Sequence, residues 1–107
     1  MNFSKKTGGN DMQFVIIAHD AKGMLEKRLE VRPRHLENLA NTNGKVLAAG
    51  GMLDENGKPN GSAVIAEFES REALDEYLKT EPYIQAGVWE KVEVTPMNVA
   101  IFDGKQL

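Results

Sequence analysis

The sequence predicts a small α+β domain, and three observations support this fold class. Its 107 residues are enough for one domain with a single modest core. Hydrophobic residues at 41% and charged residues at 27% are typical of a folded globular chain rather than of a disordered one. Along the chain, strand-like and helix-like hydrophobic periods alternate in the order strand, helix, strand, strand, helix, strand.

The first strand and the first helix are predicted within residues 12–43. Residues 14–18 form a nearly continuous apolar run, as in a central strand that ends near Asp20. The next apolar residues recur at offsets of four, seven and four, which is a helical stripe: Leu25, Leu29, Leu36 and Ala40. Pro33 interrupts the stripe, so we expect a kink or two consecutive helical pieces. Gly44 is expected to end the helix in the left-handed conformation.

The second half of the chain predicts three strands and one helix. Residues 45–53 are the second strand, in which Gly50-Gly51 indicates a bulge or a close backbone approach. Residues 62–69 are the third strand, and Ser70 is a plausible cap for a helix that ends before Pro82. That helix places these residues on one face: Ala73, Leu74, Tyr77 and Leu78. Residues 88–95 alternate as a fourth strand, with Trp89 on the side opposite the valines.

This order of elements is the ferredoxin-like βαββαβ plan, a four-stranded antiparallel sheet with its helices on one face. The chain is too short to supply a second helical layer for the other face. We therefore expect a homodimer in which two sheets pack together.

Composition and charge exclude several classes of function. The chain has no cysteine, so it can form neither a disulfide nor a cysteine zinc site, and a reducing cytoplasm suits it. A net charge of -3 without a basic stripe argues against nucleic-acid binding. We find no membrane-spanning or signal-peptide run. Residues 1–11 are interpreted as a flexible N-terminal extension, and residues 12–107 as the folded domain.

Several short strings from residue 12 to residue 96 together resemble the YciI-like proteins. The strings are Ala18-His19-Asp20, Leu25-Glu26-Lys27-Arg28-Leu29, Val31-Arg32-Pro33, His35-Leu36, Leu47-Ala48-Ala49-Gly50-Gly51, the segment from Gly61 to Glu69, Pro82-Tyr83 and Ala86-Gly87-Val88. The resemblance implies a ferredoxin-like subunit, a dimeric α/β barrel related to muconolactone-isomerase-like proteins, and a pocket with a His-Asp pair. It also implies dehydrohalogenase-like proton transfer on ring compounds, an activity associated with some members.

His35 and Asp20 are the residues that match this pair. From the residues alone, His35 would share a helix flank with Arg28 and Arg32, which is more often a solvated basic surface. Asp20 alone is more simply a turn residue. The resemblance favours a site in which Asp20 accepts the Nδ1 proton of His35 and the other ring nitrogen acts as a base. His19 points to the opposite face, and a two-histidine metal site lacks a recognisable motif, so we expect no metal.

Five further positions are candidates for substrate binding. Arg28 and Arg32 could hold an anionic substrate, or they could form surface ion pairs. Ser62, after Gly61, could bind a substrate oxygen, although this position is more often the exit of a hairpin. Tyr83 could close the pocket with its phenol or could be packing. Glu81 stands where many relatives have Asp, so its side chain is longer than theirs.

Two functions of different classes remain open at this stage. The first is a cofactor-independent small-molecule enzyme, a lyase or isomerase, in which His35 removes a proton; a cofactorless oxygenase is a variant of this class. The alternative is a non-catalytic barrel that binds a small metabolite, in which the polar pair only satisfies buried hydrogen bonds.

Overall fold

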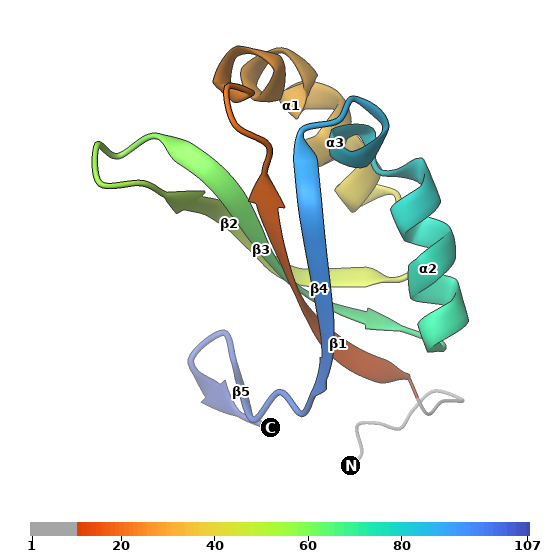
Figure 1. Cartoon of the computed structure of the whole chain (residues 1–107). Helices are drawn as coiled ribbons and strands as arrows, with labels where there is room; N and C mark the ends of the chain where they lie inside the picture. Colours follow the sequence, from red (N-terminus) through yellow and green to blue (C-terminus); the bar gives the residue numbers. More distant parts are fainter. Residues whose placement is uncertain (1–10) are drawn as a thin grey trace.

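The computed structural model describes residues 11–107 and contains one four-stranded antiparallel sheet (Figure 1). Of the predicted N-terminal extension, residues 1–10 lie outside the described residues. The elements are β1 (Met12–Asp20), α1 (Leu25–Ala40), β2 (Lys45–Leu53), β3 (Pro59–Phe68), α2 (Arg71–Thr80), α3 (Pro82–Gln85), β4 (Trp89–Met97), β5 (Ile101–Phe102) and β6 (Lys105–Gln106). The predicted ferredoxin-like α+β fold is confirmed.

The strands lie in the order β2-β3-β1-β4, and the helices cover one face of the sheet (Figure 1). Alternate residues of β1 and β3 point into the core between sheet and helices, because strand side chains alternate between faces. The core residues of these two strands are Phe14, Ile16, Ala18, Val64, Ala66 and Phe68. Among the described residues, no helix lies on the other face of the sheet (Figure 1), as the sequence predicted.

The helix α1 differs from prediction in its continuity and in the face it buries. It runs without interruption through Pro33, which lies on the exposed side where water can satisfy the carbonyl that proline leaves unpaired. Leu29 and Leu36 are 55% and 43% exposed. The buried stripe consists instead of Arg28, Val31, His35 and Leu39. The predicted leucine stripe is therefore wrong, and a stripe that contains two polar residues faces the core.

Gly44 also differs from prediction. Its φ angle is not among the positive ones, so it is not a left-handed cap, and α1 ends at Ala40 with Asn41 as its cap. A Cβ atom at Gly44 would lie 2.4 Å from the carbonyl oxygen of Glu67 and 2.5 Å from the Phe68 ring. Glycine is required here because the chain passes directly against β3.

Trp89 lies on the core side of the sheet rather than on the predicted outer side. The pairing of β1 with β4 shifts register between His19 and Asp20, so that His19 lies opposite Lys91 while Asp20 lies opposite Trp89. This irregularity re-aims the end of the strand, as bulges commonly do. Trp89 is 5% exposed and packs with Val88 in the core.

Three elements were not predicted: the short helix α3 and the hairpin formed by β5 and β6. The hairpin stands apart from the main sheet (Figure 1), and Ile101 and Phe102 on it are exposed. Within residues 11–107, no helix combines the length and apolar character needed to cross a membrane.

Candidate functional site

A cluster of polar and aromatic side chains is buried where α1, α3 and the ends of three strands meet. We call it the His35 cluster, and it consists of Asp20, Arg28, His35, Ser62, Tyr77, Glu81, Tyr83 and Trp89. Seven of these residues are classed as buried, with Glu81 0% and His35 6% exposed, and the Asp20 side chain is 5% exposed. Buried charged and polar groups need partners, and the partners here define two networks.

The first network joins His35 to Glu81. The Nδ1 atom of His35 lies 2.7 Å from Oε1 of Glu81. Glu81 is placed by two helices at once, because it is the residue that ends α2 and the residue that caps α3. Its Oε1 also accepts a hydrogen bond of 3.0 Å from the backbone N–H of Tyr83. The proline that follows at the start of α3 has no N–H to satisfy and suits this position.

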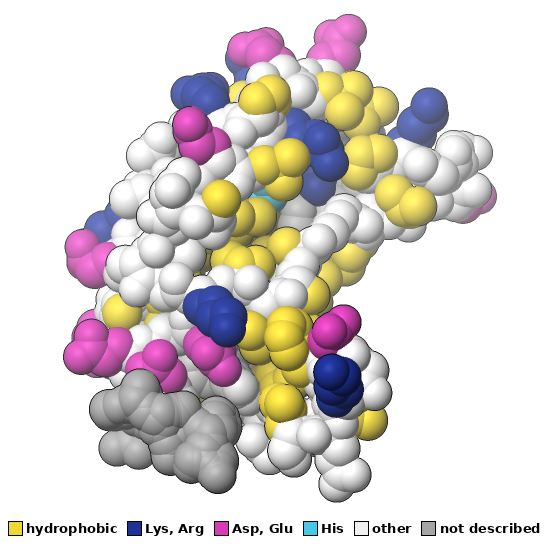
Figure 2. All heavy atoms as spheres, turned by 180° about the vertical axis from the view of Figure 1, so that it is seen from behind, with side chains coloured by type: hydrophobic (Ala, Val, Ile, Leu, Met, Phe, Trp, Pro, Cys, Tyr) yellow, Lys and Arg dark blue, Asp and Glu magenta, His cyan; other side chains and the backbone are white. Residues whose placement is uncertain are grey.

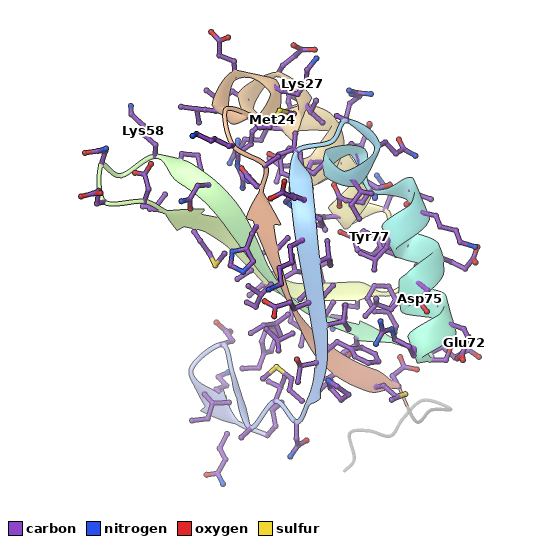
Figure 3. The ribbon with its side chains drawn as sticks, in the orientation of Figure 1. Met24, Lys27, Lys58, Glu72, Asp75 and Tyr77 are labelled. Atoms are coloured by element: carbon purple, nitrogen blue, oxygen red, sulfur yellow. The ribbon has the colours of Figure 1, made fainter. Side chains whose placement is uncertain are left out.

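The hydroxyl of Tyr77 is a further donor to the carboxyl group of Glu81. The Tyr77 hydroxyl donates to Oε2 of Glu81 at 2.5 Å, and Figure 3 shows Tyr77 pointing from α2 toward the interior, with Glu72 on the outer side of that helix. Two of the contacts, from the backbone N–H of Tyr83 and the hydroxyl of Tyr77, are donated to Glu81 and favour its ionised form. Opposite a carboxylate the Nδ1 atom of His35 acts as the donor, so we assign the neutral ring the tautomer with its proton on Nδ1 and a lone pair on Nε2.

The second network contains Asp20, and it corrects the predicted His35–Asp20 pair. Nη1 of Arg28 donates to both carboxylate oxygens of Asp20, at 2.8 and 2.9 Å. His35 lies about two helical turns beyond Arg28 on α1, beside α3, so it meets Glu81 instead. Burial raises the pKa of Asp20 above its ordinary value, although the Arg28 guanidinium acts in the opposite direction.

Ser62 joins Arg28 to Trp89. Its hydroxyl accepts a hydrogen bond of 2.8 Å from Nη2 of Arg28 and one of 3.3 Å from the indole N–H of Trp89. Gly51, on β2, makes room for this arrangement, since a Cβ there would lie 3.4 Å from Nη2 of Arg28. The nearest atoms to that Cβ belong to side chains, and the register of β2 shifts at Val46/Ala48 and Met52/Leu53, so neither the bulge nor the close backbone approach predicted for Gly50-Gly51 is found there. Both terminal nitrogens of Arg28 thus have partners within the protein.

Tyr83 contacts both networks. Its ring stacks on the imidazole of His35, with a centroid distance of 3.9 Å and an angle of 17°. The guanidinium carbon of Arg28 lies 4.8 Å from the centre of the same ring. Burial raises the pKa of Tyr83, while the charges of Arg28 and then Arg32 oppose that rise. Arg32 is itself exposed, and it lies near enough to act on the phenol.

Three polar atoms of the cluster have no hydrogen-bond partner within residues 11–107: Nε of Arg28, Nε2 of His35 and the hydroxyl of Tyr83. Every fully buried side-chain nitrogen or oxygen atom in that part of the chain does have a partner. None of the three is therefore completely shielded from solvent, although His35 is only 6% and Tyr83 only 1% exposed. A base with a free lone pair and a hydroxyl donor, joined by one ring stack, form a site suited to proton transfer.

His19 takes no part in this site. It is half exposed, lies opposite Lys91 on the other face of the sheet, and its Nε2 is 3.4 Å from a carboxylate oxygen of Glu93. A two-histidine site is therefore absent from the described part of the chain, which also holds no group of three acidic, His or Cys residues suited to a metal ion. A hollow of about 320 Å³ lies elsewhere, between the end of α1 and the start of β2.

The sequence indicated most members of the cluster but assigned some of them wrongly. Glu81 was expected to contact substrate, yet it is the partner of His35. Tyr77 was missed because its place on an apolar helix face predicted packing alone. Trp89 was likewise interpreted as packing, although its indole N–H binds Ser62. The available signal was the Tyr77–Glu81 spacing of four residues at a helix end, which brings two side chains together.

Comparison with known proteins now identifies the family. Residues 12–98 match the YCII-related domain family. The chain belongs to this family. It is 46% identical over 95 residues to the protein YciI of Escherichia coli, covering 81% of this chain and 97% of that protein. A protein of Haemophilus influenzae is 40% identical over 95 residues, with the same coverage. The predicted family resemblance is confirmed.

The solved structures agree with the fold and include a ligand complex. One is the 5-chloro-2-hydroxyhydroquinone dehydrochlorinase of Burkholderia phenoliruptrix with 2,5-dihydroxybenzoquinone bound. It is 25% identical, with a TM-score of 0.73, and covers 81% of this chain and 94% of its own. An antibiotic biosynthesis monooxygenase-type protein of Bacteroides thetaiotaomicron has a TM-score of 0.57 at 14% identity, covers 92% of this chain and 97% of its own, and shares the fold alone.

Proposed function

We propose that the protein is a small-molecule enzyme that catalyses proton transfer, as a lyase or isomerase, with His35 as the general base. The observation that carries this proposal is the buried His35–Glu81 contact of 2.7 Å together with an Nε2 atom that has no partner within residues 11–107 and is not completely shielded from solvent. A carboxylate on Nδ1 orients the ring and stabilises the imidazolium that forms when Nε2 takes a proton. Glu81 has this role here, in place of the Asp20 expected from sequence.

The reaction step follows from this arrangement. Nε2 takes a proton from a ring hydroxyl of the substrate, or from the acidic carbon of its keto tautomer, and the O–H or C–H electron pair becomes part of a new double bond. In an elimination the leaving group departs with its own bonding pair. In an isomerisation the imidazolium returns the proton to another carbon of the same conjugated system. Neither outcome needs an oxidant or a reductant, so we expect no cofactor.

Hydroxylated ring compounds are the proposed substrate class. The support is the dehydrochlorinase with a bound dihydroxybenzoquinone, which has the same fold and covers most of this chain. The aromatic ring of Tyr83 and its free hydroxyl suit a flat substrate that carries ring oxygens. Arg32, exposed and close enough to act on Tyr83, would favour a phenolate or carboxylate.

We propose that two copies of the chain associate through the open face of the sheet. Four apolar residues pair across β1 and β3 at the middle of that face and are only half-buried in one chain: Val15, Ile17, Ala63 and Ile65. Seen from behind, hydrophobic side chains also reach the surface in a band down the molecule (Figure 2). A second sheet would remove this apolar surface from water.

A panel of halogenated and non-halogenated hydroxyphenols and hydroquinones tests the proposal. Mass spectrometry of the incubated compounds reports turnover, and ligand-induced shifts of the melting temperature report binding. We expect loss of hydrogen halide or isomerisation of at least one compound. Tight binding without any conversion would reject the enzyme and leave the metabolite-binding alternative, which the low exposure of His35, 6%, would then explain.

The same panel examines Arg32. Arg32→Lys keeps the charge but loses the planar fork, so we expect weaker binding of acidic ring compounds. Arg34→Lys is the matched control, because Arg34 is also exposed on α1. Equal affinities in both variants would assign Arg32 to the surface rather than to the substrate.

A further inference from the structure

The carboxylate of Glu81 is held from two sides by different elements. Oε1 accepts from His35 of α1 and from the backbone of α3, whereas Oε2 accepts from Tyr77 of α2. Glu81 is 0% exposed, so its negative charge depends entirely on these donors. Tyr77 provides the hydrogen bond of Oε2 at 2.5 Å.

Water could not easily replace the Tyr77 hydroxyl. Tyr77 is 3% exposed and its ring stacks on Phe68 with a centroid distance of 5.7 Å. Burial, and next the charge of Glu81, raise the pKa of Tyr77 above its ordinary value. The phenol therefore keeps its proton and acts as a hydrogen-bond donor to Glu81 throughout the neutral range.

We propose that Tyr77 is a positioning residue, whose hydroxyl keeps Glu81 ionised and thereby holds His35 in the form with its proton on Nδ1. The hydroxyl never meets the substrate; it acts through Glu81. The catalytic consequence rests on the proposed function, because only the Nδ1–H form offers Nε2 as a base. The structural part of the proposal stands on the resting protein alone.

Removing the hydroxyl changes where the proton lies. Without it, Oε2 is a buried charged oxygen with no donor, and the free energy of the carboxylate form rises. The pair then takes up one proton from solvent, which resides on Glu81. Protonated Glu81 donates its O–H to Nδ1, so the ring proton moves to Nε2. In this form His35 has no free lone pair on the side that faces outward.

Nitrogen-15 NMR of histidine-labelled full-length protein tests the proposal directly. The chain has two histidines, so His19→Gln leaves the signal of His35 alone. We expect Nδ1–H to be the main neutral form in this background and Nε2–H to become the main form when Tyr77→Phe is added. Tyr83→Phe is the matched control: it removes the only other tyrosine hydroxyl, while Glu81 is bound by the backbone of Tyr83.

If Tyr77→Phe does not fold, a second measurement tests the proposal by strengthening the Tyr77 hydroxyl as a donor instead of removing it. In the Tyr83→Phe background, fluorotyrosine labels Tyr77 alone and makes its hydroxyl a stronger donor. A stronger bond to Oε2 withdraws charge from the carboxylate, so we expect the Nδ1–H proton resonance to move upfield. An unmoved resonance would overturn the proposal.

The remaining outcomes are also decisive. If folded Tyr77→Phe keeps Nδ1–H as its main form, the hydroxyl is only a structural contact and the proposal is wrong. It is equally wrong if Tyr83→Phe changes the tautomer to the same extent. These measurements need no substrate, so a panel without any turnover would reject the proposed function and leave the role of Tyr77 toward His35 intact.

Discussion

Arg28 and His35 lie seven residues apart on α1, both are buried, and each is paired with a different carboxylate. Arg28 binds Asp20 at the end of β1, and His35 contacts Glu81 between α2 and α3. The two pairs therefore have different chemistry. A permanently charged guanidinium makes the first pair structural, while an imidazole, which can change its charge near neutral pH, makes the second pair suited to proton transfer.

At this scale, Asp20→Asn is expected to destabilise the fold. It removes the charged partner of a guanidinium whose side chain is only 6% exposed. The free energy of unfolding should fall by about 1–3 kcal/mol at acidic pH, because Arg28 keeps buried N–H groups without their partner, and by less at neutral pH, where burial of the ionised Asp20 offsets part of the pair. Urea unfolding measures this change. Asp75→Asn is the control, since its pair with Arg71 is half exposed and should matter little.

The pH dependence of the same variant has a definite sign. Because burial raises the pKa of Asp20 in the folded protein, the folded state binds this proton more tightly than the unfolded chain does. The contribution to stability is complete below the ordinary value of 3.8 and is lost as the pH rises through that value toward the folded one. The stability difference between wild type and Asp20→Asn should therefore narrow as the pH rises through this window. A widening difference would show that Arg28 outweighs burial.

At the scale of elements, α2 matters because it supplies Tyr77 and ends at Glu81. Ser70 caps its first turn by accepting a hydrogen bond of 3.1 Å from the backbone N–H of Ala73. Ser70→Ala should lower the free energy of unfolding by about 1 kcal/mol, and Ser70→Asp, which keeps the cap, should restore most of it. Thermal or urea unfolding checks both variants. Equal stability of all three proteins would show that the cap contributes nothing.

The sequence predicted the existence of α1 but not its buried face. Helical periodicity and the order of elements were sufficient for the fold, because they depend on local patterns. The inward stripe contains Arg28 and His35, which can be buried only when their partners are present. The partner of His35 is 46 residues further along the chain, and no local pattern shows this contact. Contacts between residues far apart in the sequence therefore decide which face of α1 is buried.

The dependence on distant contacts also explains why the site was only partly predicted from the sequence. His35 was recognisable through the family strings, but its partner depended on how far α3 and the end of β1 lie from it. The register shift at His19 and Asp20 turned Trp89 inward, and a strict alternation of strand residues could not show this shift. Tyr77 was visible as a helix residue, and only the geometry of Glu81 made it part of the site.

At the scale of the whole molecule, the uncovered sheet face predicts a dimer that buries well over about 1,000 Å² in total. Ile65 lies on β3 between Val15 of β1 and Ala48 of β2, at the middle of that face. Ile65→Lys should therefore give a folded monomer in sedimentation velocity experiments at micromolar concentration. Leu29→Lys, a change of the same kind on the exposed side of α1, should remain dimeric. A wild-type protein that is monomeric at all concentrations would reject this assembly.

The central claim is that His35 is the base, and chemical rescue tests it most directly. His35→Ala removes the imidazole and opens a space of its size against the Tyr83 ring, beside Glu81. With any substrate found in the panel, turnover should fall by at least about 100-fold, the usual contribution of a general base. Added imidazole should then restore part of the turnover in proportion to its concentration, because it can occupy the same space. Full turnover by folded His35→Ala without imidazole would contradict the account.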